Sequence, residues 1–245
     1  EERTLADFNS PKICREFEAA CREFAPDSVI VHYVHLAFLV PCMRAALPES
    51  SRILIDTHDV SWLRRRSLHE AGQKSWFILT EQMERDILQQ FDGVIAIQQK
   101  EAAIFREMGV TKPIVVAGHP SRIHPPGGKK REPIRVLFVG ADVRPNRLAL
   151  KRLVRRIWSD TAARLSREAE LHLAGAMCRH LAADDRRPGI VVHGFVHDLE
   201  PLWAQCNIFV NPVDIGAGIK IKNVEALCHG LPLVTTPHSL IGIEA

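Results

Sequence analysis

Short apolar runs that alternate with segments of helical periodicity are the feature that most constrains how this chain of 245 residues can fold. In the first half of the chain, the apolar runs have strand length and lie at 29–34, 52–55, 93–97 and 113–116. The segments with helical spacing lie between or after them, at 36–47, 75–90 and 98–108. Strands that are separated by helical crossovers predict a parallel sheet of the α/β class.

The alternation stops at residues 118–132 and then restarts. This stretch contains Pro125-Pro126-Gly127-Gly128 and the basic run Lys129-Lys130-Arg131, a composition typical of linkers. We therefore predict two Rossmann-like α/β domains, at 1–117 and 133–245, joined by a linker at 118–132.

The second half shows the same pattern, with glycines where strands end. Gly140, Gly175 and Gly194 each follow an apolar run, and ligands of parallel sheets bind at the carboxyl ends of the strands. The expected strands are 135–139, 170–174, 190–193, 206–210 and 231–235, and the expected helices include 147–158 and 199–205.

The segment from Asn211 to Thr236 reads as loop, helix, turn and strand, and it predicts an anion site. Gly216 and Gly218 allow the backbone to approach a ligand, and the helix that follows presents free N–H groups and the positive end of its dipole. Lys220 and Lys222 add positive charge where a diphosphate would lie.

The same helix carries Glu225, whose carboxylate can accept hydrogen bonds from the hydroxyls of a ribose, and Gly230 is placed to end the helix. These residues therefore indicate a nucleotide site. The alternative is an ordinary loop and helix start of an α/β domain, in which Lys222 and Glu225 form a surface pair and Lys220 is solvated.

The order Gly-x-Gly-x-Lys-x-Lys-x-x-Glu-Ala-x-x-x-Gly-x-Pro resembles the donor-site signature of the retaining GT-B glycosyltransferases, in particular glycosyltransferase family four (group 1). The segments 136–146, 169–175 and 192–199 resemble other parts of its donor domain, and 55–59 and 91–97 resemble its amino-terminal domain. The resemblance implies the GT-B fold, and transfer of a sugar from a nucleoside diphosphate sugar to a glycan, lipid-linked or small-molecule acceptor with the anomeric configuration retained.

The resemblance also assigns residues. It implies that Glu225 holds the donor ribose, that Lys220 stabilises the departing diphosphate, and that no metal and no other cofactor is required. It makes His58 a candidate sugar contact, and the alternative is a histidine hydrogen-bonded in a strand-end turn. The expected catalytic residues are Lys220 and His58, and the expected donor-binding residues are Gly140, Arg144, Asn146, Arg147, Gly216, Gly218, Lys220, Lys222 and Glu225.

The chain departs from the family pattern at three positions. Ala217 stands where many members have a first glutamate, as in a subtype with Gly-Ala-Gly-x-Lys, and Ala141 and Asn146 stand where many have basic residues. Arg144 and Arg147 can replace those cations or lie on the surface. Two alternatives therefore remain, a non-catalytic nucleotide-sugar-binding module and, with less support, a nucleotide-sugar epimerase.

Composition excludes other classes of function. The net charge of +3 argues against nucleic acid as a partner, and the basic groups at 64–66 and 151–156 are typical of solvated helices or, as the alternative, of peripheral membrane contact. The 6 cysteines and 12 histidines show no metal-ligand spacing, so we expect free thiols and no metal. Because neither a membrane span nor a signal peptide is visible, we expect a cytoplasmic protein.

The family pattern also predicts elements that this sequence does not contain. Members open with a strand and a glycine-bearing turn and close with a helix that returns to the first domain. We therefore expect the chain to be a fragment of a longer enzyme, and to be unstable or inactive alone.

Overall fold

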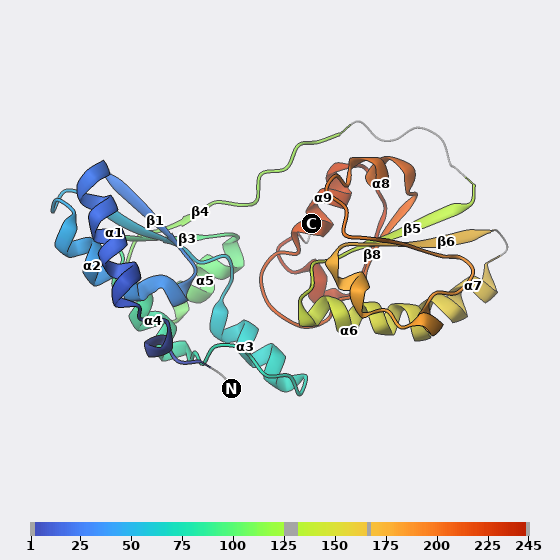
Figure 1. Ribbon diagram of the computed structural model, residues 1–245, viewed down its shortest axis with the longest axis horizontal. Coiled ribbons are helices and arrows are strands. Elements are labelled where there is room, and N and C mark those ends of the chain that lie inside the picture. The colour runs from blue at the N-terminus through green and yellow to red at the C-terminus, as the bar shows by residue number, and fades with distance from the viewer. Residues whose placement is uncertain (1–2, 125–131, 166–167, 244–245) are drawn as a thin grey trace. The chain divides into compact units, whose positions relative to one another are not determined.

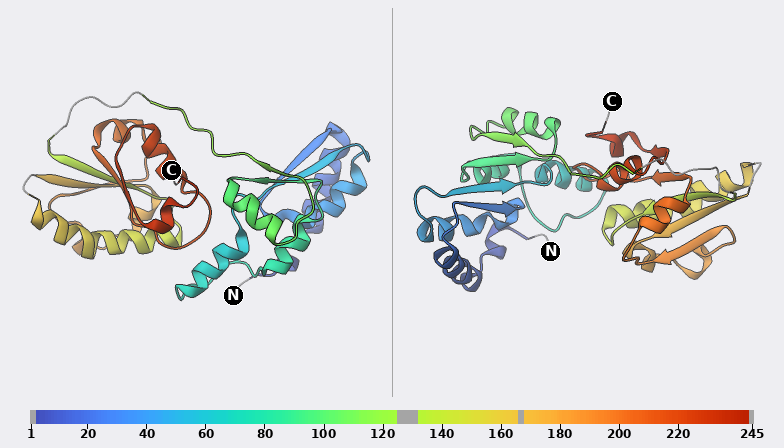
Figure 2. Two further views of the ribbon diagram at one scale, coloured as in Figure 1. Left: turned by 180° about the vertical axis from the view of Figure 1, so that it is seen from behind. Right: turned by 90° about the horizontal axis from the view of Figure 1, so that it is seen from above.

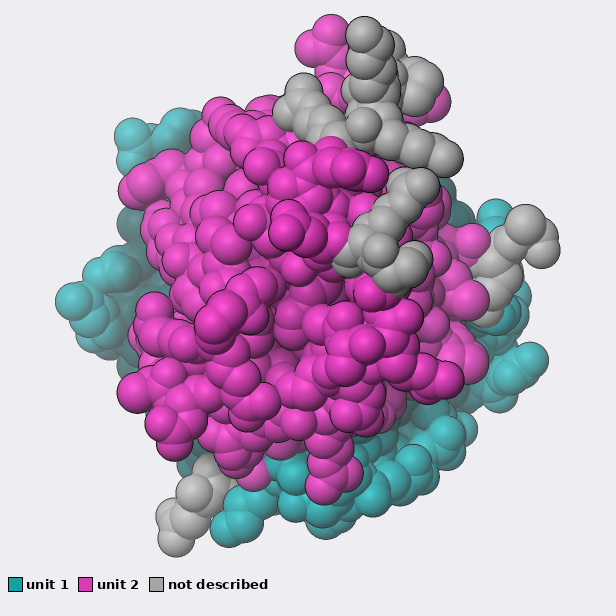
Figure 3. Space-filling view, turned by 90° about the vertical axis from the view of Figure 1, so that its right-hand side faces the viewer, with its two compact units in different colours: residues 1–119, 215–219 teal, residues 120–214, 220–245 magenta. Residues whose placement is uncertain are grey.

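The computed structural model describes residues 3–124, 132–165 and 168–243. The chain forms two compact units, residues 1–119 with 215–219 and residues 120–214 with 220–245 (Figure 3). The Pro-Gly and basic runs of the predicted linker, at 125–131, lie outside the described residues, and the domain boundaries stay a prediction. Among the helices that are described, none has the length and apolar content needed to cross a bilayer.

The first unit contains a four-stranded parallel sheet in the order β1-β2-β3-β4 (Figure 1). Its central strands are buried, with Ile53, Ile55 and Ala96 at 0% exposure, as expected for a sheet that helices cover on both faces. The strands are β1 (Ser28–His32), β2 (Arg52–Asp56), β3 (Gly93–Ala96) and β4 (Ile114–Val116).

Two of the helices expected in this unit differ from the structure, and the helices Pro11–Phe24 and Ser61–Glu70 were not expected. The expected helix at 36–47 is a 3₁₀ segment followed by a short α-helix, because Pro41 fits only the first turn of a helix. The helical elements are η1 (Leu5–Phe8), α1 (Pro11–Phe24), η2 (Val34–Leu39), α2 (Val40–Ala46), α3 (Ser61–Glu70), α4 (Glu81–Leu88) and α5 (Gln99–Glu107).

The expected helix at 75–90 is the second departure, since α4 starts only at Glu81. Thr80 caps it by accepting a hydrogen bond from the Met83 N–H at 3.2 Å. Upstream, Phe77 and Leu79 are both buried and lie two residues apart, the spacing of one face of an extended segment. Residue 77 also forms an isolated parallel bridge with Arg3. The apolar residues therefore follow an extended segment and then a helix.

The second unit contains a five-stranded parallel sheet in the order β7-β6-β5-β8-β9, with helices on both faces (Figures 1 and 2). Neighbouring residues of β5 face opposite sides. Phe138 packs in the core that includes Leu150 of α6, whereas Leu137 packs in the core that includes Ala226 of α9. The strands are β5 (Ile134–Val139), β6 (Ala169–Ala174), β7 (Ile190–Gly194), β8 (Ile208–Asn211) and β9 (Leu233–Thr235).

The helix expected at 147–158 begins earlier and runs further. Pro145 lies in the first turn of α6, where proline needs no N–H partner, and a π-helical stretch continues the helix into α7. The helical elements are α6 (Arg144–Arg152), η3 (Leu153–Trp158), α7 (Ser159–Arg164), η4 (Ala176–His180), η5 (Ala183–Asp185), α8 (Glu200–Gln205), α9 (Ile221–Cys228) and η6 (Pro237–Leu240).

A buried carboxylate anchors α3 in the first unit. Glu84 is 0% exposed, and its two carboxylate oxygens accept hydrogen bonds from the N–H groups of Ser61 at 2.9 Å and Trp62 at 2.7 Å. These are N–H groups of the first turn of α3, which lack partners within the helix. Burial raises the pKa of Glu84 to about 8, although the two hydrogen bonds lower it.

We predict that Glu84 makes the fold less stable as the pH rises. Because its pKa is about 8 in the folded chain and its ordinary value is 4.5, the folded state keeps a proton that the unfolded state releases between these pH values. Its contribution to the free energy of unfolding falls by at most about 1.4 kcal/mol per pH unit. Urea unfolding from pH 5 to 8 should show this slope in the wild type and in Glu81→Gln, an exposed control on the same helix. An unchanged slope in Glu84→Gln would contradict the prediction.

Candidate functional site

The second unit has a topological switch point between β5 and β8. From β5 the chain proceeds to β6 and β7 on one side, and then crosses to β8 and β9 on the other. Val136 of β5 pairs with Ile208 of β8 in parallel register, so both strands end at the same edge. Crossovers leave this edge in opposite directions, which opens a crevice where α/β sheets bind ligands.

Lys222 of α9 reaches into this edge. Its Nζ donates hydrogen bonds to the Val139 carbonyl oxygen at 3.3 Å and to Asn146 Oδ1 at 2.7 Å, and it lies 4.7 Å from the centre of the Phe138 ring. Burial, and to a smaller extent the charge of Lys220, lower the pKa of Lys222 to about 7. A cation held in this way is available to a dianionic ligand at neutral pH.

Asn146 links this lysine to the loop after β5. The residue is buried in the first turn of α6, and its Nδ2 donates to the Ala141 carbonyl oxygen at 3.0 Å while its Oδ1 accepts from Lys222. The structure therefore brings together two of the expected donor-binding residues, although Asn146 acts as a neutral partner of a lysine.

Two glycines at strand ends allow the backbone and side chains at this edge of the sheet to pack closely. A Cβ at Gly140 would lie 2.5 Å from Met177 Sδ and 3.0 Å from Asn146 Cγ. A Cβ at Gly175 would lie 2.1 Å from the Gly140 carbonyl oxygen, and the φ of Gly175 is 105°. Only glycine fits at either position without displacing its neighbours.

A buried amide network, which the sequence reasoning missed, holds the start of α9 against β8. Asn211 Nδ2 donates to Asn223 Oδ1 at 2.7 Å, and Asn223 Nδ2 donates to the Ser239 carbonyl oxygen at 2.7 Å. All three residues are 0% exposed. Buried amides need partners, so asparagine at the end of an apolar strand was the signal that could have revealed this network.

The two arginines of α6 differ in their surroundings. Arg144 is exposed at the first position of the helix. The Nε of Arg147 lies 3.4 Å from Asp142 Oδ1, and Arg179 and His180 contact the same carboxylate at 3.2 and 2.7 Å. Arg147 is therefore partly neutralised by Asp142, a residue that the sequence reasoning did not single out.

The loop before α9 contains two glycines with positive φ angles, and two of the expected site residues lie at or in the helix. Gly216 and Gly218 have φ angles of 108° and 73°, which favour glycine. Lys220 directly precedes α9 at its N-cap position, and Glu225 lies in the second turn with partial exposure. Beyond the helix, Gly230 has a φ of 69°, as expected for a residue that ends a helix.

A pocket of about 440 Å³ lies at the ends of β6 and β7 in the same unit. Arg179 and Arg186 bring positive charge to it, and Phe195 offers an aromatic ring. Burial lowers the pKa of His193 in its wall, and the neighbouring His172 adds to this effect. The lining residues are Gly175, Ala176, Cys178, Arg179, Arg186, Val192, His193, Gly194 and Phe195.

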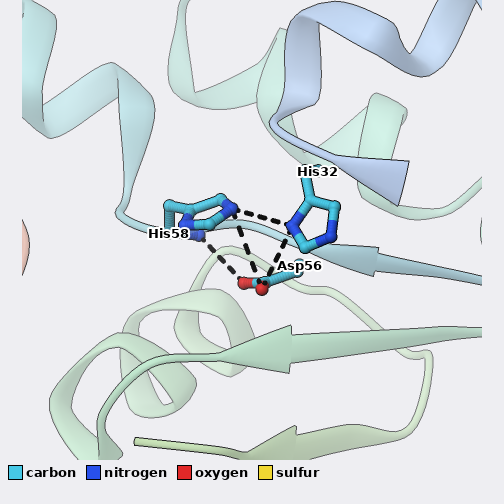
Figure 4. Close-up of side chains that lie close together, drawn as sticks. All are labelled: His32, Asp56 and His58. Carbon is cyan, nitrogen blue, oxygen red and sulfur yellow. Dashed lines mark hydrogen bonds and ion pairs between the residues drawn. The ribbon is translucent and has the colours of Figure 1, made fainter. Parts of the chain in front are cut away.

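In the first unit, the expected sugar contact His58 lies just beyond the carboxyl end of β2 (Figure 4). Its Nε2 is 3.0 Å from Nδ1 of His32, which ends β1, and its ring stacks on Tyr33 with centroids 4.1 Å apart. Its N–H donates to Asp56 Oδ1 at 3.4 Å. His58 is therefore part of a cluster and also occupies a strand-end turn.

Comparisons with known proteins agree with this architecture. The family described as "Glycosyl transferases group 1" matches residues 133–244, and the "Glycosyl transferase 4-like domain" matches residues 2–120. No curated protein matches the sequence.

Among solved structures, sucrose-phosphate synthase from Thermosynechococcus elongatus is 17% identical with a TM-score of 0.70, over 95% of this chain and 61% of that one. A TarM mutant from S. aureus, in complex with fondaparinux, alpha-GlcNAc-glycerol and UDP, is 13% identical with a TM-score of 0.63, over 91% and 44%. A trehalose-6-phosphate synthase is 10% identical with a TM-score of 0.61, over 94% and 63%. This chain thus spans between 44% and 63% of their lengths.

Two parallel α/β sheets in separate units, together with the likeness to these solved structures, show the GT-B fold. The chain belongs to the group 1 glycosyl transferases. The Gly-Ala-Gly-x-Lys subtype stays a prediction.

We predict that Gly140→Ala destabilises the protein. The added methyl group would overlap Met177 Sδ and displace Asn146, and overpacking of this kind costs about 1–3 kcal/mol of unfolding free energy. Gly118→Ala is the matched control, since the nearest atom to its Cβ would be the Ile97 carbonyl oxygen at 3.8 Å. Urea unfolding of both variants measures the difference, and equal stabilities would show that the edge is not tightly packed.

Proposed function

We propose that the protein transfers a sugar from a nucleoside diphosphate sugar to a glycan or another hydroxyl acceptor, with retention of the anomeric configuration. The observation that carries this proposal is the half-buried Lys222 at the switch point of a parallel sheet, where its ammonium group contacts the end of β5. A cation at this position suits the diphosphate of a nucleotide better than it suits an uncharged ligand.

The diphosphate is bound by the start of α9 and the loop before it. Lys220, Lys222 and the N–H groups of the first turn supply positive charge, and Gly216 and Gly218 let the loop backbone approach the phosphates. Arg144 adds an exposed guanidinium at the start of α6, and Gly140 lets Asn146 pack closely against the end of β5. Arg147 contributes less, because it is paired with Asp142.

Glu225 binds the hydroxyls of the ribose. It follows Lys222 by three residues, so the two side chains project from the same side of α9. The pocket between Arg179, Arg186 and Phe195 lies at the same edge of the sheet and accommodates the remainder of the nucleotide.

In the reaction, the bond between the sugar and the diphosphate breaks while the acceptor oxygen forms a bond to the same carbon. Lys220 and Lys222 stabilise the charge that develops on the leaving diphosphate, whose oxygen receives the acceptor proton. His58 contacts the sugar. Neither a covalent nucleophile nor a metal takes part in the proposed transfer step.

Two of the structural relatives support the proposal. The TarM complex contains UDP together with a GlcNAc-glycerol, and the trehalose-6-phosphate synthase is described in work on glycosyltransfer with retention. Both observations concern those proteins, and their fold is shared by this chain.

A non-catalytic nucleotide-sugar-binding module is the second candidate. The observation that favours it is the low number of unpaired cations after β5, where Asn146 is neutral and Arg147 contacts Asp142. The two functions differ in one measurement, since only the transferase consumes the donor when acceptors are present.

We predict different kinetic defects for two variants of the full-length protein. Lys220→Ala should lower kcat by about 100-fold, the effect of removing one group that stabilises developing negative charge. Glu225→Gln should raise the KM for the donor about tenfold, because a charged hydrogen-bond acceptor is lost in the bound and transition states alike. Lys151→Ala, an exposed lysine of α6, is the control.

Donor turnover measures both effects, and NMR of the product reports its anomeric configuration. Full activity in both variants would remove the roles given to Lys220 and Glu225. An inverted product would contradict retention.

We also predict that donor binding takes up a proton at Lys222. Because its pKa is about 7, most of this lysine is neutral at pH 8, and a bound diphosphate favours the charged form. Titration calorimetry at pH 8 in buffers of different ionisation enthalpy should detect up to about one proton per donor, and less at pH 6.

Two methionine variants test the source of this proton. Lys222→Met should lose the uptake, whereas Lys151→Met, the same change at an exposed position, should keep it. Uptake that is equal in Lys222→Met and the wild type would assign the proton to another group.

A further inference from the structure

Three potential metal ligands meet at the carboxyl ends of β1 and β2 in the first unit. His32 is the last residue of β1, Asp56 is the last residue of β2 and pairs with it in register, and His58 follows two residues later. Figure 4 shows the two imidazole rings and the carboxylate directed toward one another.

The distances between the ligand atoms match the first shell of a zinc ion. His32 Nδ1 lies 3.0 Å from His58 Nε2, and Asp56 Oδ2 lies 3.4 Å from the first nitrogen and 3.7 Å from the second. Zinc–nitrogen and zinc–oxygen bonds of about 2.0–2.2 Å at tetrahedral angles separate two ligand atoms by about 3.3–3.6 Å. Three ligand atoms spaced in this way need only tenths of an ångström of adjustment to bind one ion.

The surrounding backbone holds these groups in place. Asp56 Oδ1 accepts the His58 N–H at 3.4 Å, and the Asp56 carbonyl oxygen accepts the Tyr33 N–H at 3.0 Å. Tyr33 and His58 have φ angles of 70° and 62°, which cost free energy in residues other than glycine, and the two rings stack on one another. The loops are therefore held in unusual conformations that direct His58 toward His32.

The cluster is also accessible. The side chains of His32, His58 and Asp56 are 55%, 33% and 26% exposed, so an ion can enter and keep water in its remaining position. Divalent transition metals bind a set of two imidazoles and one carboxylate more readily than magnesium or calcium does. We propose that His32, Asp56 and His58 form a binding site for a divalent transition-metal ion, with zinc as the best match.

A second group of histidines and a carboxylate, in the other unit, has the wrong geometry for the same role. His124 and His229 stack face to face, with centroids 3.9 Å apart and ring planes at 14°, beside Glu200. The nitrogen lone pairs of an imidazole lie in the ring plane, so those of two stacked rings run side by side and do not converge on one ion. In the first cluster the rings are 5.2 Å apart at 39° and face each other through their nitrogens.

The metal site is independent of the transfer chemistry, apart from His58. If His58 contacts the donor sugar, an ion on its Nε2 would compete with that contact, and this consequence rests on the proposed function. Metal binding itself does not.

The experiment is a titration of the metal-free, full-length protein with Co²⁺ and Zn²⁺. Co²⁺ should develop the visible absorption of a nitrogen- and oxygen-ligated site with about one ion per chain, Zn²⁺ should displace it, and Mg²⁺ should not. His32→Ala, Asp56→Asn and His58→Asn should each weaken binding by more than about 10–100-fold, the loss that removal of an outer-shell partner causes. His124→Ala, in the stacked pair, should bind as the wild type does.

Thermal unfolding of each variant without metal separates a lost ligand from a lost fold, and asparagine at residue 58 is chosen because it tolerates a positive φ. Wild-type protein that binds no Co²⁺ would overturn the proposal, and so would binding that survives in a folded His32→Ala/His58→Asn double variant. In either case the contact between the two rings would be only a hydrogen bond between the imidazoles.

Discussion

The candidate donor site depends on the half-buried ammonium group of Lys222 at the edge of the five-stranded sheet. Lys222 leaves the first turn of α9 and donates to the end of β5 and to Asn146, so one side chain connects the helix that follows β8 with the strand beside it. Its desolvation is unfavourable for the charged form, which is why the pKa falls to about 7. The diphosphate of the proposed donor offsets this cost, so we expect its binding to be coupled to protonation of this residue.

Glycines and buried amides make that arrangement possible. Gly140 and Gly175 allow the carboxyl ends of β5 and β6 to pack closely, because a side chain at either position would overlap its neighbours. Asn223 ties α9 to β8 through Asn211, and both amides are fully buried with their partners supplied by the protein. The turn proposed to bind the diphosphate is thus held in place by the protein itself, and preorganisation of this kind lowers the cost of binding.

Periodicity in the sequence predicted the bounds of the strands more accurately than those of the helices. The strands at 135–139 and 170–174 are each within one residue of β5 and β6, because a buried parallel strand is a short apolar run with sharp limits. The helix at 75–90 was wrong in its first part, since alternating and helical apolar patterns cannot be separated over a few residues. Glu225, Lys220 and Lys222 were assigned to one helix start from spacing alone, and α9 contains or adjoins all three.

The sequence by itself determined the α/β class and the family, and it predicted the glycine-lysine segment of the candidate donor site, because these are local patterns within a few residues of one another. Only the tertiary structure showed that Lys222 contacts the end of β5, that Asp142 pairs with Arg147, and that His32 and His58 meet. The physical reason is the parallel sheet, which aligns the ends of strands that are distant in the chain. Contacts at those ends depend on strand order and register, which local spacing does not encode.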